Sequence, residues 1–172
     1  MRELIVIDGY NFIFRYYKSK NNKNGELELL RDKLVENLVE YKNQTGFDIV
    51  VVFDSHMSKN KAKSSLKYKG IEIIYSGERK SADDVIEKIA FLKSGYDRKY
   101  IVTSDNIQQT VIFKENIYRK SIREFYSEIK ARKKETRSKI ENSNKKQSAF
   151  GFLSIEKRLK KDQREEILKI KK

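Results

Sequence analysis

The chain has 172 residues, of which 38% are hydrophobic, so it can build one modest core and leaves no room for a second full domain. Cysteine is absent and His56 is the single histidine, which excludes a disulfide framework, a thiolate metal site and a histidine-rich zinc site. The formal net charge of +14 favours an anionic partner, and any metal ion here must be held by oxygen.

Short apolar runs alternate with helical patterns in the first half of the chain. Residues 4–7 predict a strand, and a short helix is expected at 10–17. Apolar residues recur every three or four positions over 26–45, which predicts an amphipathic helix. Residues 49–53 are a β-branched run typical of a strand buried on both faces of a parallel sheet. We expect the Lys- and Ser-rich segment 55–70 to be exposed.

The alternation continues in the second half. Residues 71–75 predict a strand, and a capping-box spacing at residue 81 opens a helix that ends near residue 95. The next expected elements are a strand at 100–103, a helix at 106–114 and a short strand at 117–119.

The C-terminal part is expected to be helical and basic. A second capping box predicts a long helix over residues 121–141, followed by a linker at 142–149 and a final helix at 155–170. We therefore predict two parts, a domain over residues 1–141 and a basic linker with a C-terminal helix over 142–172.

Strands alternating with helices predict an α/β fold with a central parallel sheet of about five strands and right-handed crossovers. We expect the strand order 3-2-1-4-5, in which the first and fourth strands are neighbours at the switch point. Binding crevices of such sheets lie outside the carboxyl ends of the strands. The predicted topology therefore gathers four acidic positions there, namely Asp8, Asp54, Asp83 or Asp84, and Asp105.

Each acid has a second interpretation, because aspartate is a common helix N-cap that contributes about 1 kcal/mol. Ser81 and Ser104 can serve as caps themselves, however, which leaves Asp83 and Asp105 available. Converging carboxylates repel one another unless a cation or donors neutralise them. The sequence therefore predicts a hard divalent cation such as Mg²⁺, which prefers oxygen ligands.

Residues 8–11, Asp-Gly-Tyr-Asn, resemble the signature that opens NYN domains of the PIN-like nuclease superfamily. The resemblance covers about residues 3–130 and has the spacing of the YacP-like branch, with further matching motifs at residues 30–32, 51–54, 81–83 and 103–105. It implies a Rossmann-like fold and a metal-dependent endoribonuclease that uses Mg²⁺ or Mn²⁺. In the YacP-like branch it also implies association with ribosomes and cleavage of mRNA during translation.

The resemblance also implies roles for individual residues. The metal carboxylates would be Asp8, Asp83 and Asp105, and Asn11 would orient a ligand or phosphate in the catalytic set. Accessory roles fall to Asp54, Asp84 and Arg31, although Arg31 also fits a plain surface charge. The histidine at position 56 is left outside the catalytic set.

The positive charge concentrates in the tail, where residues 130–172 carry 16 Lys and Arg against 6 Asp and Glu. Such a stretch is the electrostatic footprint of a nucleic-acid binder, with a solvated helix face as the alternative. We predict contacts with the RNA backbone from Lys59, Lys61, Lys63, Lys67, Lys69, Arg132, Lys133 and Lys134. Sparse apolar residues in the tail argue against membrane binding, and with no apolar run long enough to span a bilayer we expect a cytoplasmic location.

Two other functions remain open at this point. One is a noncatalytic RNA- or ribosome-binding module that has kept the fold. The other is a receiver-like phospho-acceptor domain with Lys120 as its late lysine, but a receiver needs adjacent acids after its first strand and Asp8 is followed by Gly9. The sequence does not define the oligomeric state, the number of metal ions or the RNA sequence that is cut.

Overall fold

The computed structural model describes residues 1–17, 24–55, 64–77, 80–104 and 116–158, with side chains described in the last range as far as residue 144. The chain divides into two compact units, Met1–Arg132 and Lys133–Lys172. The first unit contains the whole sheet and is the part described below. The predicted boundary at residue 141 stays a prediction.

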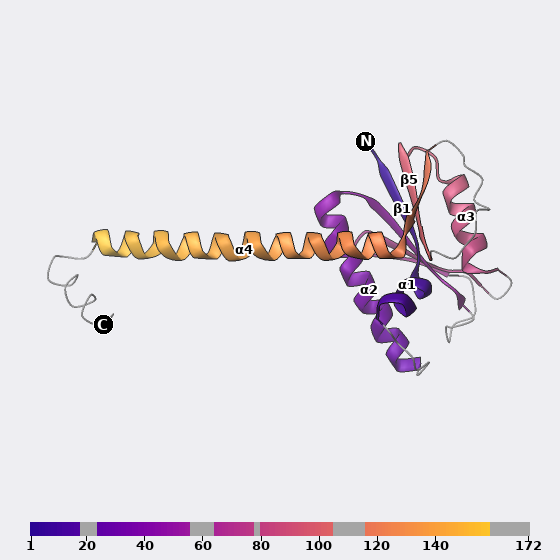
Figure 1. The fold of residues 1–172 in the computed structure, drawn as a ribbon, viewed down its shortest axis with the longest axis horizontal. Coiled ribbons are helices and arrows are strands. Elements are labelled where there is room, and N and C mark those ends of the chain that lie inside the picture. The colour runs from indigo at the N-terminus through magenta and orange to yellow at the C-terminus, as the bar shows by residue number, and fades with distance from the viewer. Residues whose placement is uncertain (18–23, 56–63, 78–79, 105–115, 159–172) are drawn as a thin grey trace. The chain divides into compact units, whose positions relative to one another are not determined.

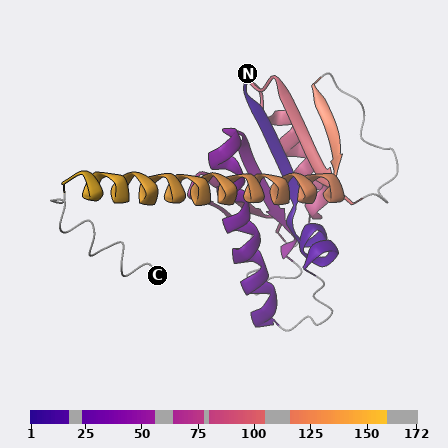
Figure 2. The same ribbon diagram turned by 60° about the vertical axis from the view of Figure 1, so that its left-hand side comes forward.

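A six-stranded sheet forms the centre of the first unit, in the order β3-β4-β2-β1-β5-β6. In Figure 2 the indigo β1 lies beside the pink β5, and the orange β6 follows at the edge. Five strands run parallel and one antiparallel. In chain order the strands are β1 (Glu3–Asp8), β2 (Asp48–Phe53), β3 (Ser64–Tyr68), β4 (Ile71–Tyr75), β5 (Arg98–Thr103) and β6 (Ile117–Ser121).

The five parallel strands confirm the expected order 3-2-1-4-5. The sixth strand, β3, was not predicted and falls in a segment expected only to be exposed. It forms one edge of the sheet and pairs antiparallel with β4 through a tight turn at Lys69 and Gly70, whose φ angles are 45° and 83°. Four of its five residues are exposed, so apolar periodicity gave no signal for it.

Helices cover both faces of this sheet, as Figure 1 shows for α1 and α2 on one side and α3 on the other. The side chains of β1 alternate between the two layers, because successive residues of a strand point to opposite faces. Ile5 and Ile7 join the core under α1 and α2, while Leu4 and Val6 join the core under α3. The helix bounds are α1 (Gly9–Tyr16), α2 (Asn24–Thr45), α3 (Ala82–Leu92) and α4 (Ile122–Arg158).

The last helix, α4, begins with the predicted capping box. The Ser121 backbone N–H donates to Glu124 Oε2 at 2.9 Å, and the Glu124 N–H donates to Ser121 Oγ at 3.2 Å. The helix then continues to Arg158, so the linker expected at residues 142–149 is helical instead. No glycine or proline occurs in residues 142–149. The helices expected at 106–114 and, beyond Arg158, at 155–170 lie outside the described residues.

Candidate active site

The buried carboxylate of Asp8 is the centre of the candidate site. It ends β1 and caps α1, with its Oδ1 accepting the Asn11 backbone N–H at 3.0 Å. The Asn11 side-chain amide donates to Oδ2 at 2.6 Å. Asp8 is 5% exposed, and both of its oxygens are therefore held in a fixed orientation by one residue.

The glycine between these two residues is required by close packing. A Cβ atom built on Gly9 would lie 2.3 Å from Cε1 of the Phe53 ring. Phe53 is buried at the end of β2 and packs edge-on against Tyr10, with ring centroids 5.1 Å apart. The ring at the end of β2 thus fixes where α1 starts and where Asp8 points.

The two consecutive acids at the start of α3 have different environments. Asp84 completes a capping box with Ser81, because the Ser81 N–H donates to Asp84 Oδ2 and the Asp84 N–H donates to Ser81 Oγ, both at 3.1 Å. These bonds hold the pKa of Asp84 below its ordinary value. Asp83 takes no part in that box and its charge acts on Asp8 instead. The capping box thus assigns Asp84 to the start of the helix and leaves Asp83 outside the box, while the role of Asp83 as a metal ligand stays a prediction.

Asp54 and two buried hydroxyl groups complete the carboxyl edge of the sheet. Asp54 and Ser55 follow β2, and Thr103 ends β5, next in register to Asp8. Because side chains two residues apart on a strand share a face, Thr103 lies on the same face as Ile101, which packs under α3. The Oγ atoms of Ser55 and Thr103 are buried, and neither has a hydrogen-bond partner among the described residues. A buried hydroxyl without a partner costs free energy unless a bound group or water satisfies it.

The electrostatics of the site centre on Asp8, whose pKa is raised. Burial is the largest cause; the hydrogen bonds from Asn11 oppose it, and the negative charges of Asp83 and Asp54 raise the pKa further. The negative charges of Asp83 and Asp54 therefore disfavour the charged form of Asp8. A divalent cation among them would remove that penalty, and carboxylate and hydroxyl oxygens are the donors that a hard cation takes.

The third predicted metal ligand, Asp105, lies outside the described residues, as does His56. Among the residues that are described, no three acidic or histidine side chains are placed closely enough to hold a metal ion by themselves. The set expected from the sequence therefore stays a prediction, with Asp8 and Asp83 as its described members.

Arg31 belongs to α2, the helix that covers the opposite face of the sheet. Its guanidinium donates to the Tyr75 hydroxyl at 3.4 Å and pairs with Glu28 at 3.6 Å. It also hydrogen-bonds to the Tyr10 hydroxyl, although burial still raises the pKa of that phenol. Only 14% of the Arg31 side chain is exposed, so the plain surface-charge interpretation does not hold.

The predicted RNA-binding lysines are spread over several places. Lys59, Lys61 and Lys63 lie outside the described residues. Lys67 and Lys69 lie on β3 and its turn, at the amino end of β4, because β3 runs antiparallel and carries the chain back across the sheet. Their expected place on the same rim as the carboxylates is therefore wrong, and Lys69 pairs with Glu36 at 3.1 Å.

The remaining predicted cations belong to other elements. Arg132, Lys133 and Lys134 lie on α4, where Arg132 and Lys134 are exposed. Lys120, the lysine of the receiver-like alternative, binds Glu128 at 2.8 Å and lies over the Tyr100 ring. Lys120 therefore contacts side chains of α4 and β5, and not Asp8.

The unpartnered hydroxyls of Ser55 and Thr103 were not predicted from the sequence. The signal was available in part, because both positions follow or end strands whose carboxyl ends carry the acids. Their burial without partners is a property of the packed structure and has no signature in composition or periodicity.

The mostly parallel α/β sheet with acids at its carboxyl edge is the architecture of a PIN-like, nuclease-type domain, as the comparisons below show. None of the described helices is long and apolar enough to cross a membrane. The family model of the YacP-like NYN domain matches residues 5–172, so the chain belongs to that family. A curated relative, "Uncharacterized protein YacP" of Bacillus subtilis (strain 168), is 34% identical over 128 residues, which are 74% of this chain and 75% of the relative.

Solved structures of that relative match as well. The crystal structure of Rae1 (YacP) from Bacillus subtilis has a TM-score of 0.69 at 30% identity, covering 97% of this chain and 91% of that one. The crystal structure of a point mutant of the same relative has a TM-score of 0.66 at 30% identity and covers 82% of each chain. These matches agree with the resemblance found in the sequence, and PIN-like nuclease domains generally use divalent metals.

Proposed function

We propose that the protein is a metal-dependent endoribonuclease that cleaves RNA phosphodiester bonds, with mRNA on translating ribosomes as its substrate. The observation that supports this most is the buried Asp8 carboxylate, fixed by Asn11 and flanked by the charges of Asp83 and Asp54. The basic chain supports a polyanionic substrate. The choice of mRNA and of the ribosome rests on the resemblance to the YacP-like branch.

In this proposal Asp8, Asp83 and Asp105 hold Mg²⁺ or Mn²⁺. Such an ion would neutralise charge on the phosphate. It would also lower the pKa of a bound water, so that hydroxide is available near neutral pH. Asn11 keeps the Asp8 carboxylate in one orientation, which removes the cost of ordering it when substrate binds. Asp84 stabilises the start of α3 and acts on the site only through the position of Asp83.

Two further groups position the site in this proposal. The Thr103 hydroxyl, buried at the end of β5 without a partner among the described residues, would be satisfied by a bound water or ion near Asp8. Arg31 braces Tyr10 and Tyr75 from the opposite face of the sheet. It therefore supports the start of α1 and does not contact the scissile bond.

The test uses purified protein with labelled RNA and, separately, with translating ribosomes, in Mg²⁺, Mn²⁺ or EDTA, followed by mapping of the cut ends. We expect Asp8→Asn and Asp83→Asn to abolish cleavage while RNA binding is retained. The matched control is Glu87→Gln, which removes one negative charge from an exposed position on the same helix as Asp83. It should cleave at the wild-type rate.

Equal activity in EDTA would refute the proposed function. Binding to RNA or ribosomes without cleavage at every metal tested would instead favour the noncatalytic binding module. Cleavage confined to ribosomes would support the ribosomal substrate over free RNA.

A further inference from the structure

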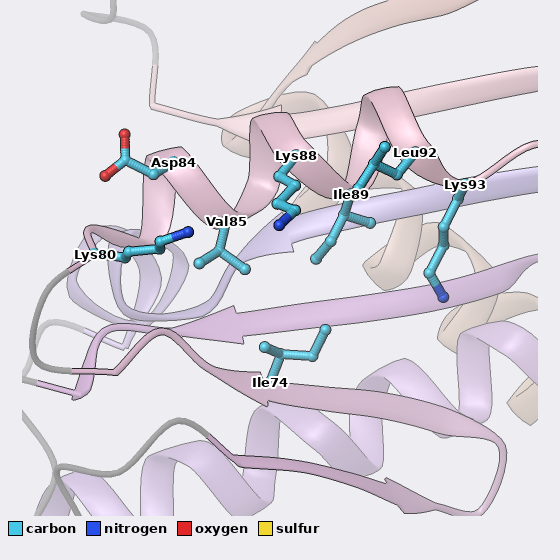
Figure 3. A pocket seen from close by; sticks show the side chains of 8 residues that line it. All are labelled: Ile74, Lys80, Asp84, Val85, Lys88, Ile89, Leu92 and Lys93. Atoms are coloured by element: carbon cyan, nitrogen blue, oxygen red, sulfur yellow. The ribbon is translucent and has the colours of Figure 1, made fainter.

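A groove lies along α3 on the side that faces β4, and its volume is about 230 Å³. Its floor is aliphatic, formed by Ile74 of β4 and by Val85, Ile89 and Leu92 of α3. Figure 3 shows these side chains facing the space between the helix and the strand. Leu92 is 67% exposed, so an apolar surface here remains open to solvent.

Lysines rim this groove. Figure 3 shows the ammonium groups of Lys80 and Lys88 directed into the groove and the carboxylate of Asp84 directed away from it. Asp84 is also bound in the capping box with Ser81. Lys93, at the far end, is neutralised by an ion pair with Glu72. Lys88 has no ion pair within the described residues, so the groove presents positive charge near its middle.

The groove begins at the first turn of α3, which also carries Asp83 of the proposed active site. Lys80 immediately precedes the Ser81 cap, and Asp84 neighbours Asp83 in the first turn of α3. A ligand that occupied the groove would therefore extend from the carboxyl edge of the sheet along α3. At about 230 Å³ the groove is smaller than the roughly 300 to 1,000 Å³ of typical small-molecule sites, so it can hold only a part of a larger ligand, such as one unit of a polymer.

We propose that this groove binds one nucleotide of a single-stranded RNA substrate next to the scissile phosphate, an inference that rests on the proposed function. The aliphatic floor contacts the base or ribose, and Lys80 and Lys88 contact the flanking phosphates. Single-stranded RNA presents unstacked bases that can enter such a cavity, whereas a duplex does not. Because the floor is aliphatic and lacks the ring stacking that reads bases tightly, the contact is tolerant of sequence.

The experiment measures binding of a short labelled oligouridylate to the full chain in EDTA, as a function of salt. One lost phosphate contact lowers the slope of log K against log salt by about 0.7, which is about 2.5-fold in affinity between roughly 50 and 200 mM salt. We expect this loss for Lys88→Ala. The matched control is Lys33→Ala, which removes an exposed lysine from α2, a helix on the opposite face of the sheet, and should leave the slope unchanged.

A positional readout accompanies the titration. Thiouridine placed in the oligonucleotide should cross-link to α3 peptides that contain Val85 to Leu92. Equal slopes for Lys88→Ala and Lys33→Ala, or cross-links that avoid α3, would overturn the groove proposal while leaving cleavage untouched. Binding in the groove with no cleavage at any metal would overturn the proposed function and leave the groove proposal standing.

Discussion

Replacing Gly9 by alanine should destabilise the fold through one steric overlap. The new Cβ would lie 2.3, 2.6 and 2.9 Å from three atoms of the Phe53 ring, all closer than atoms tolerate. Phe53 is 1% exposed and is packed between Tyr10 and Tyr75, so the ring has nowhere to move. Overpacking of this kind costs about 1–3 kcal/mol. A glycine-to-alanine change within a helix otherwise gains up to about 1 kcal/mol, so we expect a net loss of about 1–2 kcal/mol.

Urea denaturation of the wild type, Gly9→Ala, Phe53→Val and the double variant tests this explanation. In a Phe53→Val background, which lacks the clashing ring atoms, the cost of Gly9→Ala should fall below about 0.5 kcal/mol, giving a coupling energy of about 1 kcal/mol or more. The control is Gly46→Ala, where φ is +75° and no atom lies within 4 Å of the new Cβ. There the cost is backbone strain of about 1–2 kcal/mol and should be the same in both backgrounds. Additive costs at Gly9 and Phe53 would refute the steric argument.

Three further predictions concern caps and charges. Asp84→Ala should lower the urea midpoint and keep RNA cleavage, because Asp84 accepts the Ser81 N–H in the capping box, whereas Asp83→Asn should lose cleavage with little change in the urea midpoint; the reverse pattern would exchange their roles. Asp48 has a lowered pKa, chiefly because Lys42 donates to it, so its stabilisation is present above about pH 4 and is lost as the pH falls through the folded pKa. Asp48→Asn should therefore cost up to about 1 kcal/mol near neutral pH, and thermal unfolding should show that difference vanishing in acid. Ser121→Ala should cost about 1 kcal/mol by urea denaturation, and an unchanged midpoint would mean that the α4 capping box is energetically idle.

Periodicity and strand-end acids were enough to predict most of the fold. The β-branched run in β2 identified a central strand, and the alternation of strands with helices predicted a parallel sheet whose expected order the structure confirms. The strand β3 was not predicted, because four of its five residues are exposed and it forms by pairing with β4. The continuation of α4 past residue 141 was not predicted, because polar composition alone cannot distinguish a solvated helix from a linker.

The candidate site was predictable where it depends on topology. Parallel strands bring Asp8 and Asp54 to one edge wherever the loops run, and the helix after β4 delivers an acid to the same edge. Which of Asp83 and Asp84 faces inward depends on a capping geometry that two adjacent aspartates leave ambiguous in sequence. The position of Lys67 and Lys69 depends on an antiparallel hairpin, a tertiary pairing that local charge does not encode.

The capping box at Ser81 has a consequence for how this chain can change over generations. Each residue turns a helix by about 100°, so removing one residue between Ser81 and Asp83 would place Asp84 where Asp83 now lies and leave the Ser81 N–H without its carboxylate acceptor. A change of length in the first turn of α3 is therefore expected to disturb both the helix cap and the proposed site. The start of α3 thus affects both the stability of the protein, through the capping box, and the position of Asp83 in the proposed site.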